Sequence, residues 1–195
     1  MPSNEAKNYI TIVSGLPRSG TSMMMQMLAA GGMPVLSDNI RRADEDNPRG
    51  YYEYEAVKTT DQDASWLIHA YGKAVKMVYL LLYELPQDHN YRVVLMTREI
   101  SEVMDSQEAM LRRHSRDAGV LSSAELGRVF ENELSKLQSW LQDRPHLKVL
   151  KVSYNSMIRD PDCEVRRLVA FLDRSLDMNA MVAALDRSLY RQRRH

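Results

Sequence analysis

Cysteine is almost absent from this chain of 195 residues, since Cys163 is the only one. A single thiol excludes an internal disulfide and a metal site built from several cysteines, and it fits a reducing compartment. Histidine is also sparse, and four of the five histidines share no ligand spacing: His69, His89, His114 and His146. We therefore expect no metal site.

The chain also lacks an excess of charge, because 26 Lys and Arg residues balance 26 Asp and Glu residues. Without a net field, the whole molecule does not attract nucleic acid or an anionic membrane. No stretch reaches the roughly 18 apolar residues of a membrane span, and residues 1–8 lack the apolar core of a secretion signal. We expect a cytoplasmic protein with one domain over residues 1–195, and the sequence favours neither monomer nor dimer.

Short apolar runs alternate with helical patterns along the chain. Runs rich in β-branched residues predict buried parallel strands at residues 9–13, 74–80, 92–96 and 147–152. Helical periodicity, with Ser or Asp caps, predicts helices at residues 22–30, 54–69, 101–114, 123–141 and 162–172. This alternation predicts an α/β fold, a three-layer sandwich with a mostly parallel central sheet, as in P-loop NTPases. Residues 31–50 are expected to form a surface loop.

The first predicted strand runs directly into Gly-Leu-Pro-Arg-Ser-Gly-Thr-Ser at residues 15–22. Gly15 and Gly20 let the backbone turn so that N–H groups point inward, and the following helix adds its positive N-terminal end. These features predict a phosphate-binding loop, the alternative being a tight turn without a ligand. The spacing is that of a nucleotide P-loop, but Thr21 stands where an ATPase or GTPase has Lys, so Arg18 would supply the cation.

Residues 17–22 resemble the phosphosulfate loop of the sulfotransferase family, typically Pro-(Lys/Arg)-Ser-Gly-Thr-(Thr/Ser). The resemblance implies that this loop binds the 5′-phosphosulfate end of the donor 3′-phosphoadenosine 5′-phosphosulfate, through Arg18, Ser19, Gly20, Thr21 and Ser22. It places Arg18 at the bridging oxygen, instead of the family's loop lysine, and Ser19 close to the sulfuryl group.

A second segment places Arg98 after the strand at residues 92–96 and Ser106 eight residues later, on the next predicted helix. A guanidinium and a helix hydroxyl in this arrangement suit one phosphate. The pattern resembles the sulfotransferase segment that binds the donor's 3′-phosphate. Alternatively, Arg98 is an ordinary strand-end arginine paired with Glu99 or Glu102.

A third segment, residues 149–161, resembles a family stretch that usually reads Tyr-Glu-Asp-Leu followed by Asp-Pro. Tyr154 falls where the family often places a ring or hydroxyl near the donor nucleotide, or it fills the edge of the core. Asn155 and Ser156 replace the usual acids. Asp160 and Pro161 predict a helix start, as the N-cap and the first helical residue.

The C-terminal tail, Tyr-Arg-Gln-Arg-Arg-His at residues 190–195, is rich in arginine. Family members often complete the donor site with basic residues near the C-terminus, so Arg191 or Arg193 is a candidate ligand of the 3′-phosphate. The alternative is a solvated chain end.

Sulfuryl transfer needs positioning, charge stabilisation and a base for the acceptor. Many sulfotransferases carry Lys-Thr-His where this chain has Lys76-Met-Val, so the lysine is kept and the histidine is absent. Lys76 would stabilise charge on the departing oxygen, or it is a strand lysine that points to solvent. Residues 47–55 resemble Asn-Pro-Lys-Gly-Tyr-(Phe/Trp)-Glu runs in bacterial members, which makes Glu53 the first candidate for the base and Glu55 the second. Both would otherwise be helix N-terminal glutamates.

The resemblance implies a sulfotransferase that moves a sulfuryl group to a hydroxyl or amine and releases 3′,5′-adenosine bisphosphate, without a metal. The acceptor is unidentified, and small size favours a small molecule. Nearby aromatic residues suggest an apolar wall: Tyr51, Tyr52, Tyr54 and Trp66. Two alternatives remain, a small-molecule kinase that uses ATP and magnesium, and a nucleotide-binding protein without activity.

Overall fold

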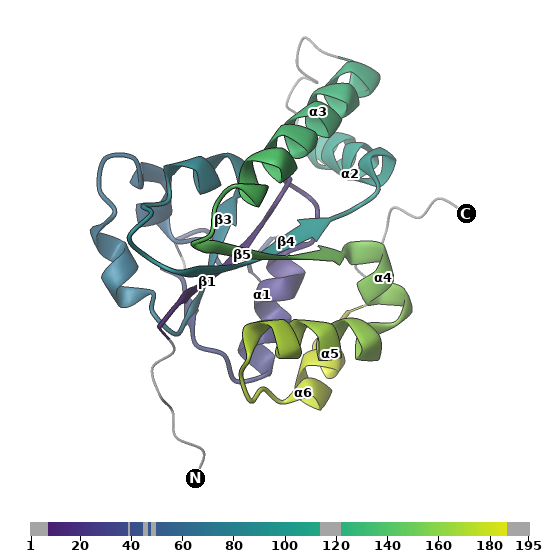
Figure 1. Ribbon diagram of the computed structural model, residues 1–195. Helices are drawn as coiled ribbons and strands as arrows, with labels where there is room; N and C mark the ends of the chain where they lie inside the picture. Colours follow the sequence, from purple (N-terminus) through teal and green to yellow (C-terminus); the bar gives the residue numbers. More distant parts are fainter. Residues whose placement is uncertain (1–7, 39, 45–46, 48–49, 114–121, 187–195) are drawn as a thin grey trace.

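The computed structural model describes residues 8–38, 40–44, 47, 50–113 and 122–186. Its centre is a five-stranded sheet in the order β2-β3-β1-β4-β5, and every neighbouring pair is parallel (Figure 1). The strands are β1 (Ile10–Gly15), β2 (Val35–Leu36), β3 (Ala74–Val78), β4 (Tyr91–Thr97) and β5 (Leu147–Ser153). The predicted α/β class with a mostly parallel sheet is confirmed.

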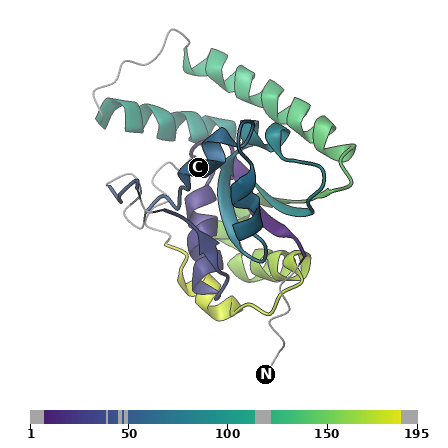
Figure 2. The ribbon, with the colours of Figure 1, turned by 90° about the vertical axis from the view of Figure 1, so that its left-hand side faces the viewer.

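Helices cover both faces of this sheet. The α-helices are α1 (Thr21–Ala30), α2 (Ile100–Arg113), α3 (Ser123–Gln142), α4 (Tyr154–Arg159), α5 (Pro161–Leu172) and α6 (Met178–Ala183). Three 3₁₀ helices accompany them, η1 (Glu55–Thr59), η2 (Ser65–His69) and η3 (Tyr79–Glu84). In Figure 1, α1, α5 and α6 lie on one side of the sheet and α3 on the other, and Figure 2 shows the same layers from the side.

Alternation along β1 divides the core into two halves. Ile10 and Ile12 belong to one hydrophobic cluster, which contains Leu137 of α3 and the buried residues of the 3₁₀ helices. Val13 belongs to the other cluster, with the methionines of α1 and the apolar faces of α4, α5 and α6. Successive side chains of a strand point to opposite faces, so a strand buried on both sides reads as a continuous apolar run.

Strand β3 ends earlier than predicted, since residues 79–80 belong to η3. The register explains this, because the last residue of β1, Gly15, pairs with Val78, and β1 offers no partner further on. The 3₁₀ turn then buries Leu82 while Leu80 stays exposed.

The predicted helix at residues 54–69 is wrong, because η1 and η2 are separated by an irregular stretch. Side chains there bond to the backbone and compete with helical hydrogen bonds. Thr60 donates to the carbonyl of Val57 at 2.6 Å, and Asp63 accepts from the N–H of Ser65 at 2.9 Å. Val57 and Trp66 are buried on either side of the break.

The segment predicted as a surface loop, residues 31–50, contains the short edge strand β2, which pairs with β3. Helices α4 and α6 were also not predicted, and both have only six residues. The predicted start of α5 is confirmed, since Asp160 caps Cys163 and Pro161 is the first helical residue. Among the described residues, no helix is long and apolar enough to cross a membrane.

Candidate functional site

A pocket of about 660 Å³ opens where the parallel strands end at their carboxyl side. Its lining includes most of the candidate residues: Arg18, Gly20, Thr21, Ser22, Glu53, Lys76, Arg98, Ser106 and Tyr154. These residues come from five separate segments, and the sheet order β3-β1-β4-β5 brings the ends of their strands together. Ligands of open α/β sheets bind at this edge.

The loop at residues 15–22 makes a tight turn between β1 and α1. Arg18 and Gly20 adopt positive φ values of 68° and 97°. Ser19 is buried and donates to the carbonyl of Leu16 at 2.7 Å, so its side chain stabilises the turn rather than lining the pocket. Helix α1 has no side-chain cap and no acid in its first turn, so the positive end of its dipole faces the pocket uncompensated by either.

The loop and the segment after β4 are joined by two hydrogen bonds. Arg98 Nη1 donates to the carbonyl oxygen of Arg18 at 3.2 Å, and Arg18 Nε donates to Ser106 Oγ at 2.9 Å. Arg18 therefore extends across to α2, although the family resemblance placed its side chain at the 5′ end of the donor.

Besides the Arg18 carbonyl, Arg98 contacts Glu102 and the Tyr154 ring. Its Nε lies 2.9 Å from Glu102 Oε2, and both side chains are almost fully buried. Asn155 donates to both oxygens of Glu102 at 3.2 Å, and the Arg98 guanidinium lies 4.4 Å from the centre of the Tyr154 ring. The predicted alternative of an Arg98–Glu102 pair is thus present, and Arg98 also lines the pocket. Tyr154 similarly combines both of its interpretations, as a core residue and a pocket residue.

Lys76 lies near the end of β3 and does not point to solvent, since its side chain is only 12% exposed. Its ammonium group donates to the carbonyl of Tyr51 and to Ser22 Oγ, the latter at 3.4 Å. Burial lowers the pKa of Lys76 to about 8, and the nearby carboxylate of Glu53 opposes that shift.

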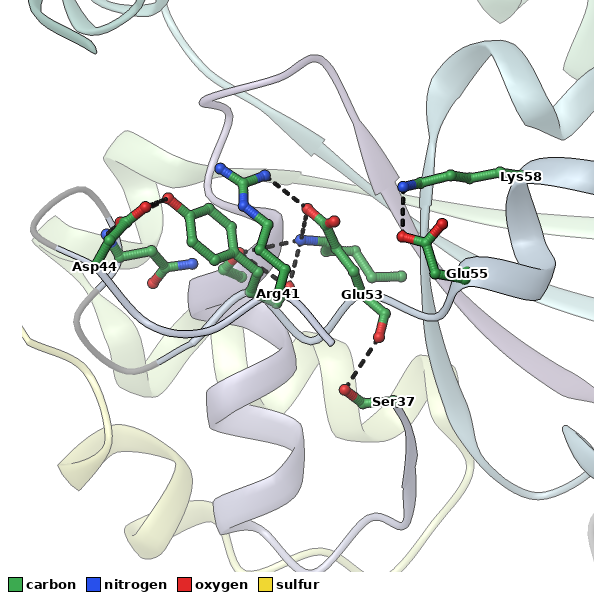
Figure 3. Close-up of polar contacts among 10 residues, drawn as sticks. Ser37, Arg41, Asp44, Glu53, Glu55 and Lys58 are labelled. Atoms are coloured by element: carbon green, nitrogen blue, oxygen red, sulfur yellow. Dashed lines mark hydrogen bonds and ion pairs between the residues drawn. The ribbon is translucent and has the colours of Figure 1, made fainter. Parts of the chain in front are cut away.

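Glu53 lines the pocket between two cations (Figure 3). Its Oε1 lies 2.9 Å from Arg41 Nη1 and 3.7 Å from Lys76 Nζ. The backbone carbonyl of Glu53 accepts from the side chain of Ser37 at 3.1 Å and from the N–H of Asp38, also at 3.1 Å. The chain after β2 therefore fixes the position of Glu53.

Glu55 does not line the pocket and pairs with Lys58, which does (Figure 3). Its side chain is 46% exposed, against 23% for Glu53. The structure thus separates the two candidate bases. Arg191 and Arg193 lie outside the described residues.

Sequence reasoning named Glu102 only as a possible partner of Arg98, and it gave Arg41 and Asn155 no role in the site. Arg41 belongs to a charged run without a recognisable motif, yet its guanidinium lies 3.4 Å from the centre of the Tyr51 ring. Tyr51 in turn donates to Asp44 at 2.7 Å. The substitution of Asn155 for an acid was the one available signal, because an amide bonds to Glu102 where a second carboxylate would repel it.

Of the aromatic residues expected to form a wall, Tyr51 and Tyr54 line the pocket. Trp66 does not line it but packs in the core, where its indole N–H donates to Thr60 at 3.2 Å. Tyr52 is not part of the lining and packs against the cluster around α1.

The fold and the pocket define an α/β domain with a tight loop and an uncapped helix N-terminus at the switch point of its sheet. The chain belongs to the sulfotransferase domain family, whose model matches residues 10–194, and the family is one of transferases. No curated protein sequence matches the chain.

Solved structures share the fold at low sequence identity. A sulfotransferase domain of the Synechococcus PCC 7002 olefin synthase has a TM-score of 0.56 and 14% identity, over 97% of this chain and 82% of that one. A sulfotransferase from Mycobacterium avium has a TM-score of 0.55 and 16% identity, over 92% and 67%. Retinol dehydratase, in complex with androsterone and the inactive cofactor PAP, has a TM-score of 0.54 and 17% identity, over 91% and 63%.

Replacing Gly20 with alanine should destabilise the protein for two reasons. The φ of 97° is unfavourable for alanine, and the new Cβ would lie 2.5 Å from the Tyr154 ring. Gly32→Ala is the matched control, because its φ is 87° but no atom lies within 4 Å of the new Cβ. We expect Gly32→Ala to cost about 1–2 kcal/mol and Gly20→Ala at least about 1 kcal/mol more, measured by urea unfolding. Equal losses of stability would contradict the predicted clash between the new Cβ and the Tyr154 ring.

The lowered pKa of Lys76 makes stability depend on pH. Between the folded pKa of about 8 and the ordinary value of 10.5, the unfolded chain binds the proton that the folded chain has lost. Stability contributed by Lys76 should therefore rise with pH across this window. In urea unfolding at several pH values, the free energy of unfolding of the wild type should rise relative to that of Lys76→Met from pH 8 to pH 10.5.

Lys58→Met is the control for this titration. The hydrogen bond to Glu55 raises the pKa of Lys58, so its contribution is present below 10.5 and is lost above that pH. The free energy of unfolding of the wild type should not rise relative to that of Lys58→Met in the same pH window. A pH-independent difference between the wild type and Lys76→Met would contradict the lowered pKa.

Proposed function

We propose that this chain is a sulfotransferase that uses 3′-phosphoadenosine 5′-phosphosulfate as the donor and a hydroxyl or amine of a small apolar molecule as the acceptor. The observation that carries the proposal is that two segments predicted to bind phosphate, the loop at residues 15–22 and the Arg98–Ser106 segment, are hydrogen-bonded to each other and line one pocket. One donor with phosphate groups at both ends of its ribose would satisfy both segments.

The residues present fit such a donor. The N–H groups at the start of α1, together with Ser22 and Lys76, suit the 5′-phosphosulfate end. Arg98 and Ser106 suit the 3′-phosphate, and Tyr154 offers an aromatic surface beside Arg98. The retinol dehydratase neighbour was solved in complex with the inactive cofactor PAP, which agrees with the proposed donor.

The donor, when bound, supplies the sulfuryl group, whose bond to the bridging oxygen breaks as the bond to the acceptor forms. Lys76 stabilises the negative charge that develops on that oxygen, because its ammonium group lies beside Ser22 of the loop. Glu53 accepts the proton of the acceptor's hydroxyl or amine. Arg41 and Lys76 hold the Glu53 carboxylate in place.

Apolar residues in the pocket lining support an apolar acceptor. They come from η1 and the residue before it, from η3 and from α2: Tyr54, Val57, Leu81, Met110 and Leu111. The volume of about 660 Å³ is within the usual range of small-molecule sites.

The loop and the ends of the strands support a kinase less well than a sulfotransferase. Kinases with a P-loop need a lysine in the loop and usually an acid at the end of a second strand to organise magnesium. Thr21 occupies the lysine position, and β3, β4 and β5 end in Val78, Thr97 and Ser153.

Donor binding can be tested by thermal unfolding. About a hundredfold excess of 3′,5′-adenosine bisphosphate over its dissociation constant should stabilise the wild type by roughly 2–3 kcal/mol. ADP with magnesium should stabilise it much less. Arg98→Ala should lose the stabilisation, because its guanidinium lines the pocket. Stronger stabilisation by ADP with magnesium than by the bisphosphate would contradict the sulfotransferase proposal and favour the kinase.

The role of Glu53 can be tested by comparison with Glu55. Glu53→Gln should lower transfer from the donor to a simple phenol, 2-naphthol, by about 10²–10⁴-fold, as expected for a general base. Glu55→Gln should leave transfer nearly unchanged, because Glu55 lies outside the pocket lining. Both variants should still be stabilised by the bisphosphate. Tight donor binding by a wild type that transfers to no acceptor would favour a binding protein without activity.

A further inference from the structure

We propose that Arg18 reads the 3′-phosphate of the donor, and so determines donor specificity, instead of serving the 5′-phosphosulfate end. The inference rests on the proposed function, because it assumes a donor with a 3′-phosphate. It departs from the role that the family resemblance gives to this loop position, where the cation acts at the bridging oxygen.

The first argument is the direction of the Arg18 side chain. Its Nε donates to Ser106 Oγ at 2.9 Å, and Ser106 lies on α2, 88 residues away in the sequence. A hydroxyl oxygen that accepts from Arg18 keeps its own O–H for donation. Ser106 is buried and lines the pocket, so this O–H is available for an anion that also contacts the Arg18 guanidinium.

The second argument is the backbone of Arg18. Its φ of 68° is in the left-handed region, and its carbonyl oxygen accepts from Arg98 Nη1 at 3.2 Å. Arg98 thus holds the Arg18 backbone, while the Arg18 side chain contacts Ser106. Two guanidinium groups and one hydroxyl are therefore linked around a single corner of the pocket.

The third argument is charge. Glu102 lies 2.9 Å from Arg98 and is almost fully buried with it, so the Arg98 charge is already offset by a carboxylate. A phosphate monoester carries close to two negative charges at neutral pH, and a second cation beside Ser106 improves its binding. Arg18 is the guanidinium that contacts Ser106.

The fourth argument is the cation at the other end of the loop. Lys76 Nζ lies 3.4 Å from Ser22 Oγ, at the first turn of α1. The 5′ end of the donor therefore has a cation without Arg18. The two positive side chains divide the donor between them, Lys76 at the sulfuryl group and Arg18 at the 3′-phosphate.

The test compares two ligands that differ only in the 3′-phosphate, 3′,5′-adenosine bisphosphate and adenosine 5′-monophosphate. Affinities are measured by isothermal titration calorimetry on the full chain. Arg18→Ala should weaken binding of the bisphosphate by about 10- to 100-fold, the size of one or two charged hydrogen bonds. Binding of the monophosphate should change by no more than about twofold.

Three further variants make the result specific. Ser106→Ala should weaken the bisphosphate alone, and the Arg18→Ala/Ser106→Ala double variant should lose less than the sum of the single losses, because both groups serve one phosphate. Arg18→Lys keeps a charge without the Nε contact, and should retain an intermediate preference for the bisphosphate. Arg112→Ala removes an arginine from the same helix as Ser106, but one whose side chain is 81% exposed, and should change neither affinity.

The outcomes separate this inference from the proposed function. Equal weakening of both ligands in Arg18→Ala would place Arg18 at the 5′ end and overturn the inference, while the sulfotransferase proposal would stand. An unchanged preference for the bisphosphate would overturn it in the same way. A wild type that binds neither ligand, or binds both equally, would overturn the proposed donor and the inference with it. If Arg18→Ala does not fold, Arg18→Lys and Ser106→Ala give the same comparison.

Discussion

The buried ion pair between Arg98 and Glu102 connects the parts of the pocket that the chain supplies from distant positions. Both side chains are almost fully removed from water, and such burial is tolerated only when each charge has partners. Arg98 meets this need with Glu102 and the Arg18 carbonyl, and Glu102 meets it with Asn155. The loop after β1, the start of α2 and the start of α4 are therefore tied to one guanidinium, and the loop is shaped before any ligand arrives.

The parallel sheet explains why these segments meet at all. Because β1 lies between β3 and β4, the residues that follow all three strands share one edge. Alternation along β3 also directs Lys76 to the face covered by α1, since Ala74 on the same face packs in that cluster and Met77 packs in the opposite one. A cation thus lies beside the first turn of α1 as a consequence of strand register.

The sequence predicted the fold class, and most of its candidate site residues line the pocket, because both depend on local patterns. Apolar runs identify β1, β4 and β5, and the loop at residues 15–22 has a recognisable spacing between a strand and a helix. The errors have different causes, and only some of them are non-local. Strand β3 stops where β1 offers no further partner, the edge strand β2 has only two residues, and the helix at 54–69 is broken by side chains bonding to the backbone. Likewise, nothing in the charged run around Arg41 indicates that it reaches Glu53.

The position of Glu53 between two cations shapes what this residue contributes. A carboxylate held by Arg41 and Lys76 has a fixed orientation in the pocket. Burial disfavours the charge of Lys76 and lowers its pKa to about 8, and the Glu53 carboxylate opposes that shift. An anion near Ser22 would favour the protonated form of Lys76, which is the form that the proposed charge stabilisation requires. In the proposed mechanism, charge stabilisation by Lys76 and proton acceptance by Glu53 therefore depend on one network of contacting charged groups, in a chain that has no histidine after Lys76.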